Sequence, residues 1–173
     1  MKALAAALLA LVAACGAGNV ILNVDVLSFL SASDSTKAYA IPVGGTVDST
    51  ISRRFTLPPG LGGSSVDSVT ATVASVLENQ TGGGSVILEV YFAQTQGGLF
   101  TGTPFLADSS GPFSGVQNVP LGKTTLPLSD PIFKSDSLWV GIRARLSVTA
   151  APMAGQLRFT DIHLRIVVQD NIL

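Results

Sequence analysis

An unbroken alternation of apolar and other side chains runs from Leu138 to Val148, and it constrains the fold more than any other feature of the chain. Every even-numbered position in this run is apolar, whereas the odd-numbered positions hold Trp139, Gly141, Arg143, Arg145 and Ser147. Successive side chains of a β-strand point to opposite faces, so the run predicts a strand with one face in a core. Beyond Cys15, no stretch of helical length shows the apolar spacing of an amphipathic helix. We therefore expect an all-β fold.

The run just described extends over residues 137–150, and similar periodicity occurs over residues 20–30, 49–57, 66–78, 85–93 and 155–169. The faces expected in the core of the runs 66–78 and 85–93 comprise Val69, Ala71, Val73 and Leu77, and Val86, Leu88, Val90 and Phe92. In the run 49–57, Arg53 shares the apolar parity, which indicates a strand near the edge of a sheet. In the run 20–30, Leu27 and Phe29 occupy the polar parity, which indicates burial on both faces or contact with a partner.

In the run 155–169 the apolar residues change from odd-numbered to even-numbered positions partway along. Leu157 and Phe159 are apolar on odd positions, whereas Ile162 and Leu164 are apolar on even ones. A strand can keep all four side chains on one face only if it contains an extra residue. The sequence therefore predicts a β-bulge near Thr160–Asp161.

The segments between the runs are rich in turn-forming residues. Residues 79–84 end in three glycines and predict a hairpin, and residues 150–155 have the length of another hairpin connection. Residues 94–131 are the least regular part, with short strands expected near 113–121 and 125–128 and a long crossing connection between sheets. Roughly eight strands result, which predicts one two-sheet antiparallel β-sandwich or jelly roll over residues 20–173.

Composition excludes several classes of function. Only 12% of the residues are charged and the net charge is −1, so the concentrated basic face of a nucleic-acid-binding protein is not expected. One cysteine excludes an intramolecular disulfide and a Cys-x-x-Cys site, and one histidine leaves little room for a histidine-based metal cluster. We expect no cofactor and no enzymatic activity.

The N-terminal residues have the pattern of an export signal. Lys2 precedes an uncharged stretch over residues 3–12, and two small residues then precede the only cysteine. The sequence Val12-Ala13-Ala14-Cys15 resembles the lipobox of bacterial lipoprotein precursors. The resemblance covers only this signal, and it implies cleavage before Cys15, a diacylglycerol on the cysteine thiol and a location in the bacterial cell envelope.

On this interpretation residues 1–14 are a signal peptide and residues 15–19 are a short tether. Two alternatives stay open. One is ordinary signal-peptidase cleavage after Ala14 or Ala17, and the other is an uncleaved anchor over residues 3–22. In either of these cases Cys15 would not carry a lipid.

Three groups of residues are candidates for binding or chemistry. Trp139, Arg143 and Arg145 share one strand face, and with Tyr91 they could stack a sugar ring and hydrogen-bond its hydroxyls or a carboxylate. The structural alternative is that Trp139 packs in or over a core and that the arginines are solvated. An aromatic content of 6% also counts against a carbohydrate-binding module.

The other two groups are weaker candidates. Asp161, His163 and Arg165 share a face and could place a general base beside a carboxylate, but no Gly-x-Ser-x-Gly motif supplies a nucleophile. A surface histidine is expected instead. The loop residues Asp108, Asp130 and Asp136 could bind calcium, but they lack the spacing of a calcium loop and are expected to form Asx-turns.

These observations favour a lipid-anchored, non-enzymatic envelope module that acts in structure or in protein interaction. Its partner would be another envelope protein or a surface polymer, and an edge strand could recruit a partner strand. A glycan- or ligand-binding module using the Trp139, Arg143 and Arg145 face is the alternative, and a small hydrolase using His163 is a second one.

Overall fold

The computed structural model describes residues 18–56, 65–135 and 137–170. Its strands, which form one antiparallel sheet, are β1 (Gly18–Asp25), β2 (Thr36–Ile41), β3 (Thr46–Thr56), β4 (Ser65–Ala93), β5 (Leu106–Ser109), β6 (Phe113–Ser114), β7 (Gln117–Thr124) and β8 (Ser137–Asp170). Short helical segments lie between them, and these are η1 (Leu27–Phe29), α2 (Ala32–Ser35), η2 (Gln96–Gly98) and η3 (Pro131–Lys134). No helix within the described ranges is long and apolar enough to cross a membrane. The all-β class predicted from the sequence is confirmed.

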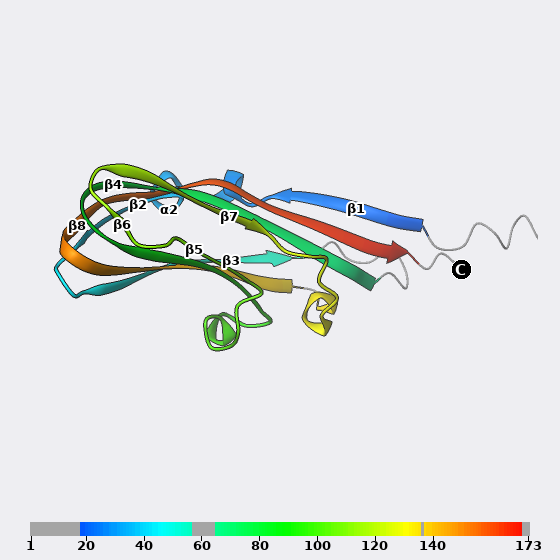
Figure 1. Cartoon of the computed structure of the whole chain (residues 1–173). Helices are drawn as coiled ribbons and strands as arrows, with labels where there is room; N and C mark the ends of the chain where they lie inside the picture. Colours follow the sequence, from blue (N-terminus) through cyan, green and yellow to red (C-terminus); the bar gives the residue numbers. More distant parts are fainter. Residues whose placement is uncertain (1–17, 57–64, 136, 171–173) are drawn as a thin grey trace, which may run out of the picture.

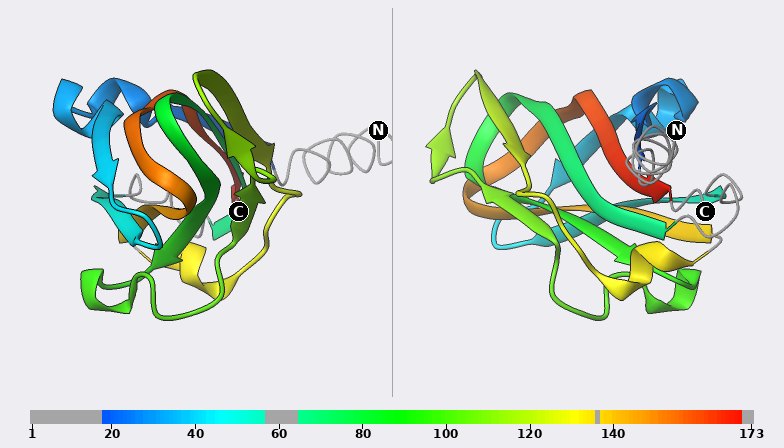
Figure 2. Two further views of the ribbon diagram at one scale, coloured as in Figure 1. Left: turned by 60° about the vertical axis from the view of Figure 1, so that its left-hand side comes forward. Right: turned by 90° about the vertical axis from the view of Figure 1, so that its right-hand side faces the viewer.

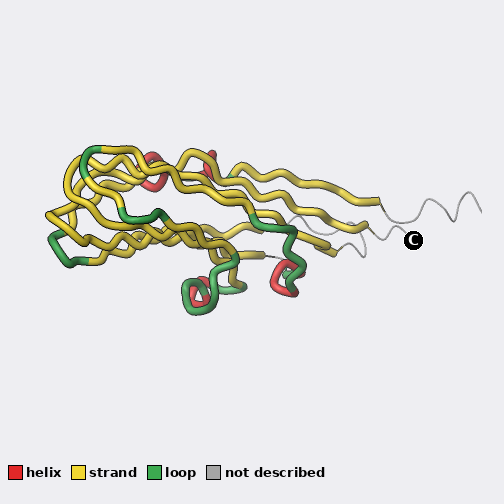
Figure 3. Tube along the Cα trace, viewed as in Figure 1, coloured by secondary structure: helices red, strands yellow, loops and turns green. Residues whose placement is uncertain are grey.

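Strands β4 and β8 are unusually long because each joins two of the predicted strands end to end. β4 contains the runs 66–78 and 85–93, and β8 contains the runs 137–150 and 155–169. The two strands pair with each other along their whole length, from Ser65 opposite Gln169 to Ala93 opposite Trp139. The hairpins predicted at residues 79–84 and 150–155 are therefore wrong, because the chain continues in strand through both segments (Figure 3).

Both long strands bend at these two segments, and glycines allow the bend. A Cβ atom on Gly84 would lie 2.1 Å from the carbonyl oxygen of Ser147, and one on Gly155 would lie 2.2 Å from that of Glu78. Gly82 has a φ of 70°, which glycine adopts without strain. The pairing register of β4 with β8 also shifts several times here, as expected where bulges turn a sheet. The glycines serve close backbone approach, not chain reversal.

The bend folds one sheet into the two layers of a sandwich (Figures 1 and 2). In one layer, β1 pairs with residues 163–170 of β8, which pair with the first half of β4, which pairs with β7. In the other layer, β3 pairs with the first half of β8, which pairs with the second half of β4, which pairs with β5. β2 and β6 pair with β8 and β4 near the bend. The sequence prediction of a two-layered antiparallel sandwich is thus confirmed.

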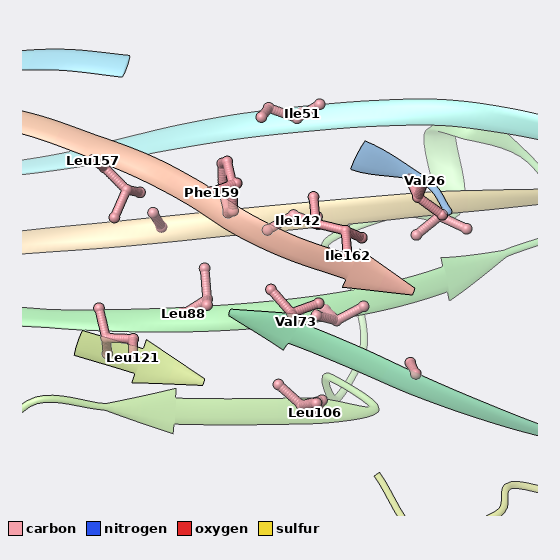
Figure 4. Close-up of a cluster of buried hydrophobic side chains, with 14 of the residues drawn as sticks. Val26, Ile51, Val73, Leu88, Leu106, Leu121, Ile142, Leu157, Phe159 and Ile162 are labelled. Carbon is pink, nitrogen blue, oxygen red and sulfur yellow. The ribbon is translucent and has the colours of Figure 1, made fainter. Parts of the chain in front are cut away.

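The core between the layers follows the parity of the sequence. The predicted inward side chains of β4 and those of the first half of β8 are all buried, and Figure 4 shows Val73, Leu88 and Ile142 together in this cluster. The consecutive residues Ala74 and Ser75 of β4 pair with Asp161 and Phe159 of β8, so Thr160 of β8 has no partner between them. Thr160 is therefore the extra residue, and the bulge predicted near Thr160–Asp161 is confirmed.

A buried asparagine ties the bend together. The Asn79 side chain accepts a hydrogen bond from the Tyr39 hydroxyl at 2.9 Å and donates to the carbonyl oxygens of Gly115 and Gly82 at 2.8 and 3.2 Å. Burial raises the pKa of Tyr39 to about 12. Because Tyr39 belongs to β2, which the sequence did not predict, this network shows that β2 is an integral part of the bend.

Two further expectations require correction. Leu27 and Phe29 lie in η1 and not in a strand, and Phe29 is 65% exposed, so they are not buried on both faces of a sheet. The middle of the chain runs back along β4 as β5, β6 and β7. Of the short strand predicted at 125–128, only a single bridge between Leu128 and Val69 forms.

Candidate functional site

The strongest candidate site is an apolar cleft at the end of the sandwich opposite the bend. β1 and β3 are the edges of the two layers on the same side of β8, and within the described residues each of them pairs only with β8. Between them lies a cleft of about 600 Å³, a volume typical of ligand-binding pockets. Its described lining residues are Ile21, Leu22, Asn23, Val24, Phe29, Arg53, Arg54, Phe55, Thr56, Val66, Val69, Phe133, Leu138, Leu164 and Ile166.

The cleft runs along the edges of β1 and β3, not over their faces. Residues 21–24 and 53–56 all line it without interruption. A cleft on the face of a strand would touch only every second residue, because alternate side chains point the other way. Contact with consecutive residues means that the backbones of both strands border the cleft.

The hydrogen-bonding direction of β1 follows from one contact beyond its end. The N–H of Val26 donates to the carbonyl oxygen of Ile162 at 2.8 Å, in register with the β1–β8 ladder. Bonded and non-bonded pairs alternate in an antiparallel ladder, so the even-numbered residues of β1 bond to β8. The N–H and C=O groups of Ile21 and Asn23 therefore point away from β8, towards the free edge.

The same reasoning applies to β3. The N–H of Val148 donates to the carbonyl oxygen of Gly45 at 3.0 Å, in register with the β3–β8 ladder. The odd-numbered residues of β3 thus bond to β8, and the backbone groups of Arg54 point to the free edge. A side-chain contact agrees, because Nη1 of Arg53 donates to the outward carbonyl oxygen of Ser52 at 3.1 Å.

The interior walls of the cleft are hydrophobic. Val69, Leu138, Leu164 and Ile166 are buried and come from both layers, and the buried ring of Phe133 in η3 packs at the same end. At the rim the exposure rises, and Ile21 is 48% exposed. A guest in this cleft would bury apolar surface on both sides, which is favourable at about 25 cal/mol per Å².

Two arginines are among the described lining residues, Arg53 on the inward parity of β3 and Arg54 on its outer parity. Arg53 contacts the carboxylate of Asp34, which also accepts a hydrogen bond from Nζ of Lys37 at 3.1 Å. The bond from Lys37, with smaller contributions from Ser31 and the two cations, holds the pKa of Asp34 below its ordinary value. Nη2 of Arg54 donates to a neutral hydroxyl oxygen, that of Ser137, at 3.1 Å. Among the described lining residues, Arg53 and Arg54 are charged and no carboxylate is present.

The predicted Trp139, Arg143 and Arg145 face exists, but its polar groups are already engaged. Nε of Arg143 donates to Oε2 of Glu89 at 2.6 Å, its guanidinium also contacts the Tyr91 hydroxyl, and it lies 5.0 Å from the centre of the Tyr91 ring. The Glu89 hydrogen bond raises the pKa of Arg143, and burial raises that of Tyr91. Nε of Arg145 donates to Asp48 at 3.1 Å.

Trp139 itself is half-buried and lies outside the main core. It packs against a small cluster of Tyr91, Ala93 and Leu99, together with Phe100, on the outer face of the sandwich. The sequence placed Trp139 and the arginines on one strand face, and the structure places them there. It adds the acidic partners Glu89 and Asp48, which come from β4 and β3.

The remaining candidates are dispersed. The imidazole of His163 contacts the carboxylate of Asp161 on the exposed face of β8, and its neighbours across the sheet are Asp25 and Thr72. Arg165 is exposed on the same face of β8.

Asp108, which the sequence placed in a loop, lies in β5, and both Asp108 and Asp130 have structural roles. Asp108 accepts hydrogen bonds from the backbone N–H groups of Ser109 and Gly122, and Asp130 caps η3 by accepting from that of Ile132. No group of potential metal-ligating side chains occurs among the residues with described positions. Asp136 and Cys15 lie outside the described residues.

The sequence did not predict the cleft, although it contained one signal for it. Arg53 on the apolar parity of a predicted edge strand indicated that this face leaves the core near that position. The cleft itself forms because β1 and β3 pair along the same side of β8, and only the folded sheet reveals this arrangement.

Comparisons with known proteins leave the function of the cleft open. No family model matches the chain, and no curated protein matches it. A solved structure of infectious bursal disease virus, Gx strain, is similar at 8% identity and a TM-score of 0.45, over 90% of this chain and 38% of the viral one. A structure of TmCBM61 in complex with β-1,4-galactotriose is similar at 9% identity and a TM-score of 0.35, over 86% of both chains. The chain thus spans well under half of the viral protein.

Proposed function

We propose that this chain is a lipid-anchored, non-enzymatic module of the bacterial cell envelope that binds another envelope protein by accepting one of its strands at the edge of β1. The observation that carries the proposal is the outer edge of β1, which no described strand pairs with, beside an apolar cleft. An extended peptide added to such an edge gains main-chain hydrogen bonds, and its alternate side chains enter the adjoining pocket.

The features of the cleft suit a strand better than a compact ligand. The outward N–H and C=O groups of Ile21 and Asn23 need hydrogen-bond partners once a guest removes water from them. A partner strand supplies both donors and acceptors at the spacing of β1. A purely apolar guest would fill the cleft and leave these groups unpaired.

The experiment that tests strand docking uses a backbone change at the free edge. A photo-cross-linking residue at position 21 of the full chain in its native host is expected to give a discrete protein adduct. The variant Asn23→Pro removes an outward N–H and is expected to abolish the adduct. The matched variant Thr50→Pro removes an outward N–H from β3 outside the cleft and should leave it. An adduct that survives Asn23→Pro, or no adduct in the parent chain, would contradict the proposal.

Anchoring at Cys15 would hold the edge of β1 close to the membrane surface. Cys15 precedes Gly18, the first residue of β1, by only two intervening residues. Two or three acyl chains would bind the membrane far more firmly than a single one. In cells fed a labelled fatty acid, the parent chain should incorporate label and sediment with membranes, whereas Cys15→Ser should do neither. A Cys15→Ser chain that is processed and retained like the parent would contradict this part of the proposal.

A second candidate function is glycan binding on the outer face at Trp139, because the ring is half-exposed and lies outside the main core. Trp139 is the chain's one tryptophan, so its fluorescence reports directly on that face. Titration with neutral and acidic oligosaccharides should then quench or shift the emission. If the emission of Trp139 stays constant up to a high concentration of every oligosaccharide tested, this candidate function is removed.

A further inference from the structure

We infer that the outer face of the sandwich carries a second interaction site, a slot over Gly141 that accepts an aromatic side chain of a partner protein. In this structure the ring of Phe100 lies in the slot and takes the place of that guest. The inference goes beyond the proposed function, because it concerns the outer face of the sandwich and not the cleft beside β1.

Gly141 leaves a gap in a row of large side chains. It lies on the outer face of β8 between Trp139 and Arg143, and its partner across the ladder in β4 is Tyr91. A glycine inside a strand weakens the strand and often marks the close approach of another group. Three large side chains therefore flank a position that has none, and the backbone of Gly141 forms the floor of the slot.

The slot fits an aromatic ring, because it already holds one. A Cβ atom on Gly141 would lie 2.8 Å from Cζ and 2.9 Å from Cε1 of Phe100, so the ring lies directly over the glycine. The rings of Phe100 and Tyr91 meet edge to face, with centroids 5.2 Å apart and an interplanar angle of 71°. This is a favoured arrangement of two aromatic rings. An aromatic guest in the same place gains the same contacts.

Phe100 holds this place with a strained backbone. Its φ is 62°, in the left-handed region that a bulky side chain rarely adopts. Within the described ranges, residues 95–104 hydrogen-bond only to one another, and this loop joins the outer cluster through Leu99 and Phe100. Strained residues are concentrated at binding and switch sites. A guest that replaces the ring would release the strain, which favours displacement of Phe100.

An aromatic side chain suits the slot better than a sugar. The guanidinium of Arg143 donates to Glu89 and contacts the hydroxyl of Tyr91, so these polar groups are engaged before any sugar hydroxyl arrives. A phenyl ring needs none of them. Aromatic side chains that fill such pockets carry much of the binding energy of protein interfaces. The guest is therefore a phenylalanine, tyrosine or tryptophan side chain, and sugar binding is an outcome of the test.

The experiment titrates the full chain with N-acetylphenylalaninamide and follows the emission of Trp139, the one tryptophan. Phe100→Gly removes the ring and relieves the strain, since glycine adopts a positive φ readily. This variant should bind the probe at least about tenfold more tightly than the parent chain, in which only a minor fraction of slots is open. The matched variant Thr103→Gly changes an exposed residue of the same loop and keeps the ring, so its affinity should equal that of the parent.

Two further measurements locate the site and define its preference. Gly141→Ala, added to Phe100→Gly, places a methyl group on the floor of the slot and should abolish binding of the probe. N-acetylleucinamide is apolar but has no ring, and it should bind Phe100→Gly about fivefold more weakly than the aromatic probe.

A folded Phe100→Gly chain that binds the aromatic probe no more tightly than the parent would overturn the inference and assign Phe100 to packing alone. Binding that survives Gly141→Ala, or equal affinity for the two probes, would overturn it as well. Tighter binding of an oligosaccharide than of the aromatic probe would overturn it in favour of a glycan site. If Phe100→Gly does not unfold cooperatively in urea, Phe100→Leu replaces it in the titration with the same expected direction. These outcomes do not bear on strand docking at β1, which cross-linking at position 21 tests.

Discussion

The edges of β1 and β3 beside the cleft, which no described strand pairs with, differ in the residues that oppose strand pairing. β3 carries Arg53 on its inward parity and Arg54 next to it, and Arg53 is held by Asp34. β1 carries no charged residue or proline before its last residue, Asp25, and it exposes Ile21. Charges and prolines on edge strands prevent unwanted strand pairing. Within the described residues, β3 thus carries the features that oppose strand pairing, and β1 lacks them before Asp25.

The far side of the sandwich supports this interpretation. There, β7 carries Pro120 and Lys123, and Nζ of Lys123 donates to the carbonyl oxygen of Ala107 in β5. Asp108 of β5 accepts from the N–H of Gly122 in β7, so the two layers are tied together at that side. Charged residues or proline thus occur on the edge strands β3 and β7, whereas β1 has neither before Asp25.

The largest expected effect comes from placing an inward-facing cation on β1, like Arg53 on β3. Leu22 lines the cleft and faces its interior, and no carboxylate is among the described lining residues. Leu22→Arg should therefore reduce the free energy of unfolding by about 3 kcal/mol, the cost of an unpaired charge in an apolar site. Urea denaturation of the parent and variant chains measures this loss.

The neighbouring variant Ile21→Arg is the control, because the side chain of Ile21 is exposed on the other parity and lies opposite the uncharged Val167. It should change the stability by less than about 0.5 kcal/mol. If Leu22→Arg were as stable as Ile21→Arg, an inward cation would be tolerated on β1 as it is on β3. The contrast between β1 and β3 would then lose its physical basis.

Proline substitutions test which backbone N–H groups of β1 and β3 are hydrogen-bonded to β8 and which point away from it. Thr50→Pro removes an N–H that points to solvent and should cost about 1 kcal/mol, whereas Ser49→Pro removes one that bonds to β8 and should cost about 3 kcal/mol. On β1, Asn23→Pro should resemble Thr50→Pro. Thermal and urea unfolding of the three variants checks the order, and a costly Asn23→Pro would mean that its N–H is already paired.

Sequence alone predicted the faces of the long strands but not their course. The parity of residues 138–148 and the bulge at Thr160 are local properties of a strand, and both were predicted correctly. The glycines at 82–84 were interpreted as a turn because turns and close backbone contacts both need residues without a side chain. Which of the two applies depends on Ser147, a residue far away in sequence.

The cleft was unpredictable for the same reason. Its two edges come from strands that share no pairing within the described residues and meet only through β8. The outer face at Trp139 was easier to foresee, since its members lie on one strand. Glu89 and Asp48, which neutralise Arg143 and Arg145, were not foreseen, because cross-strand register is needed to place them.

Removing the acid that holds Arg53 tests the protection of β3. The pKa of Asp34 is lowered in the folded chain, so its contribution to stability is present above the ordinary pKa of an aspartate and is lost as the pH falls through the folded value. Asp34→Asn should therefore lower the urea midpoint at pH 7, and the difference from the parent should disappear in acid below that folded value. A difference that persisted in strong acid would assign the effect to packing and not to charge.

The smallest expected effect concerns self-association, and it tests whether the free edge of β1 carries a cost. Ile21→Lys places a cation on the exposed parity of β1, where it should alter the free energy of unfolding by only a few tenths of a kcal/mol. It should nevertheless reduce concentration-dependent association, because a lysine on an edge opposes strand pairing between copies. Arg54→Val, which weakens the protection of β3, should increase that association.

Sedimentation velocity over a range of protein concentrations measures both changes, with Arg165→Val as the control for lost charge away from the edges. If Ile21→Lys left association unchanged while Arg54→Val increased it, the exposed edge would belong to β3 and not to β1. The two variants therefore decide which strand is the one open to pairing, even where the stability of the fold hardly changes. Lower association of Ile21→Lys would fit the proposal that β1 accepts a partner strand, because the same edge would then pair with a second copy.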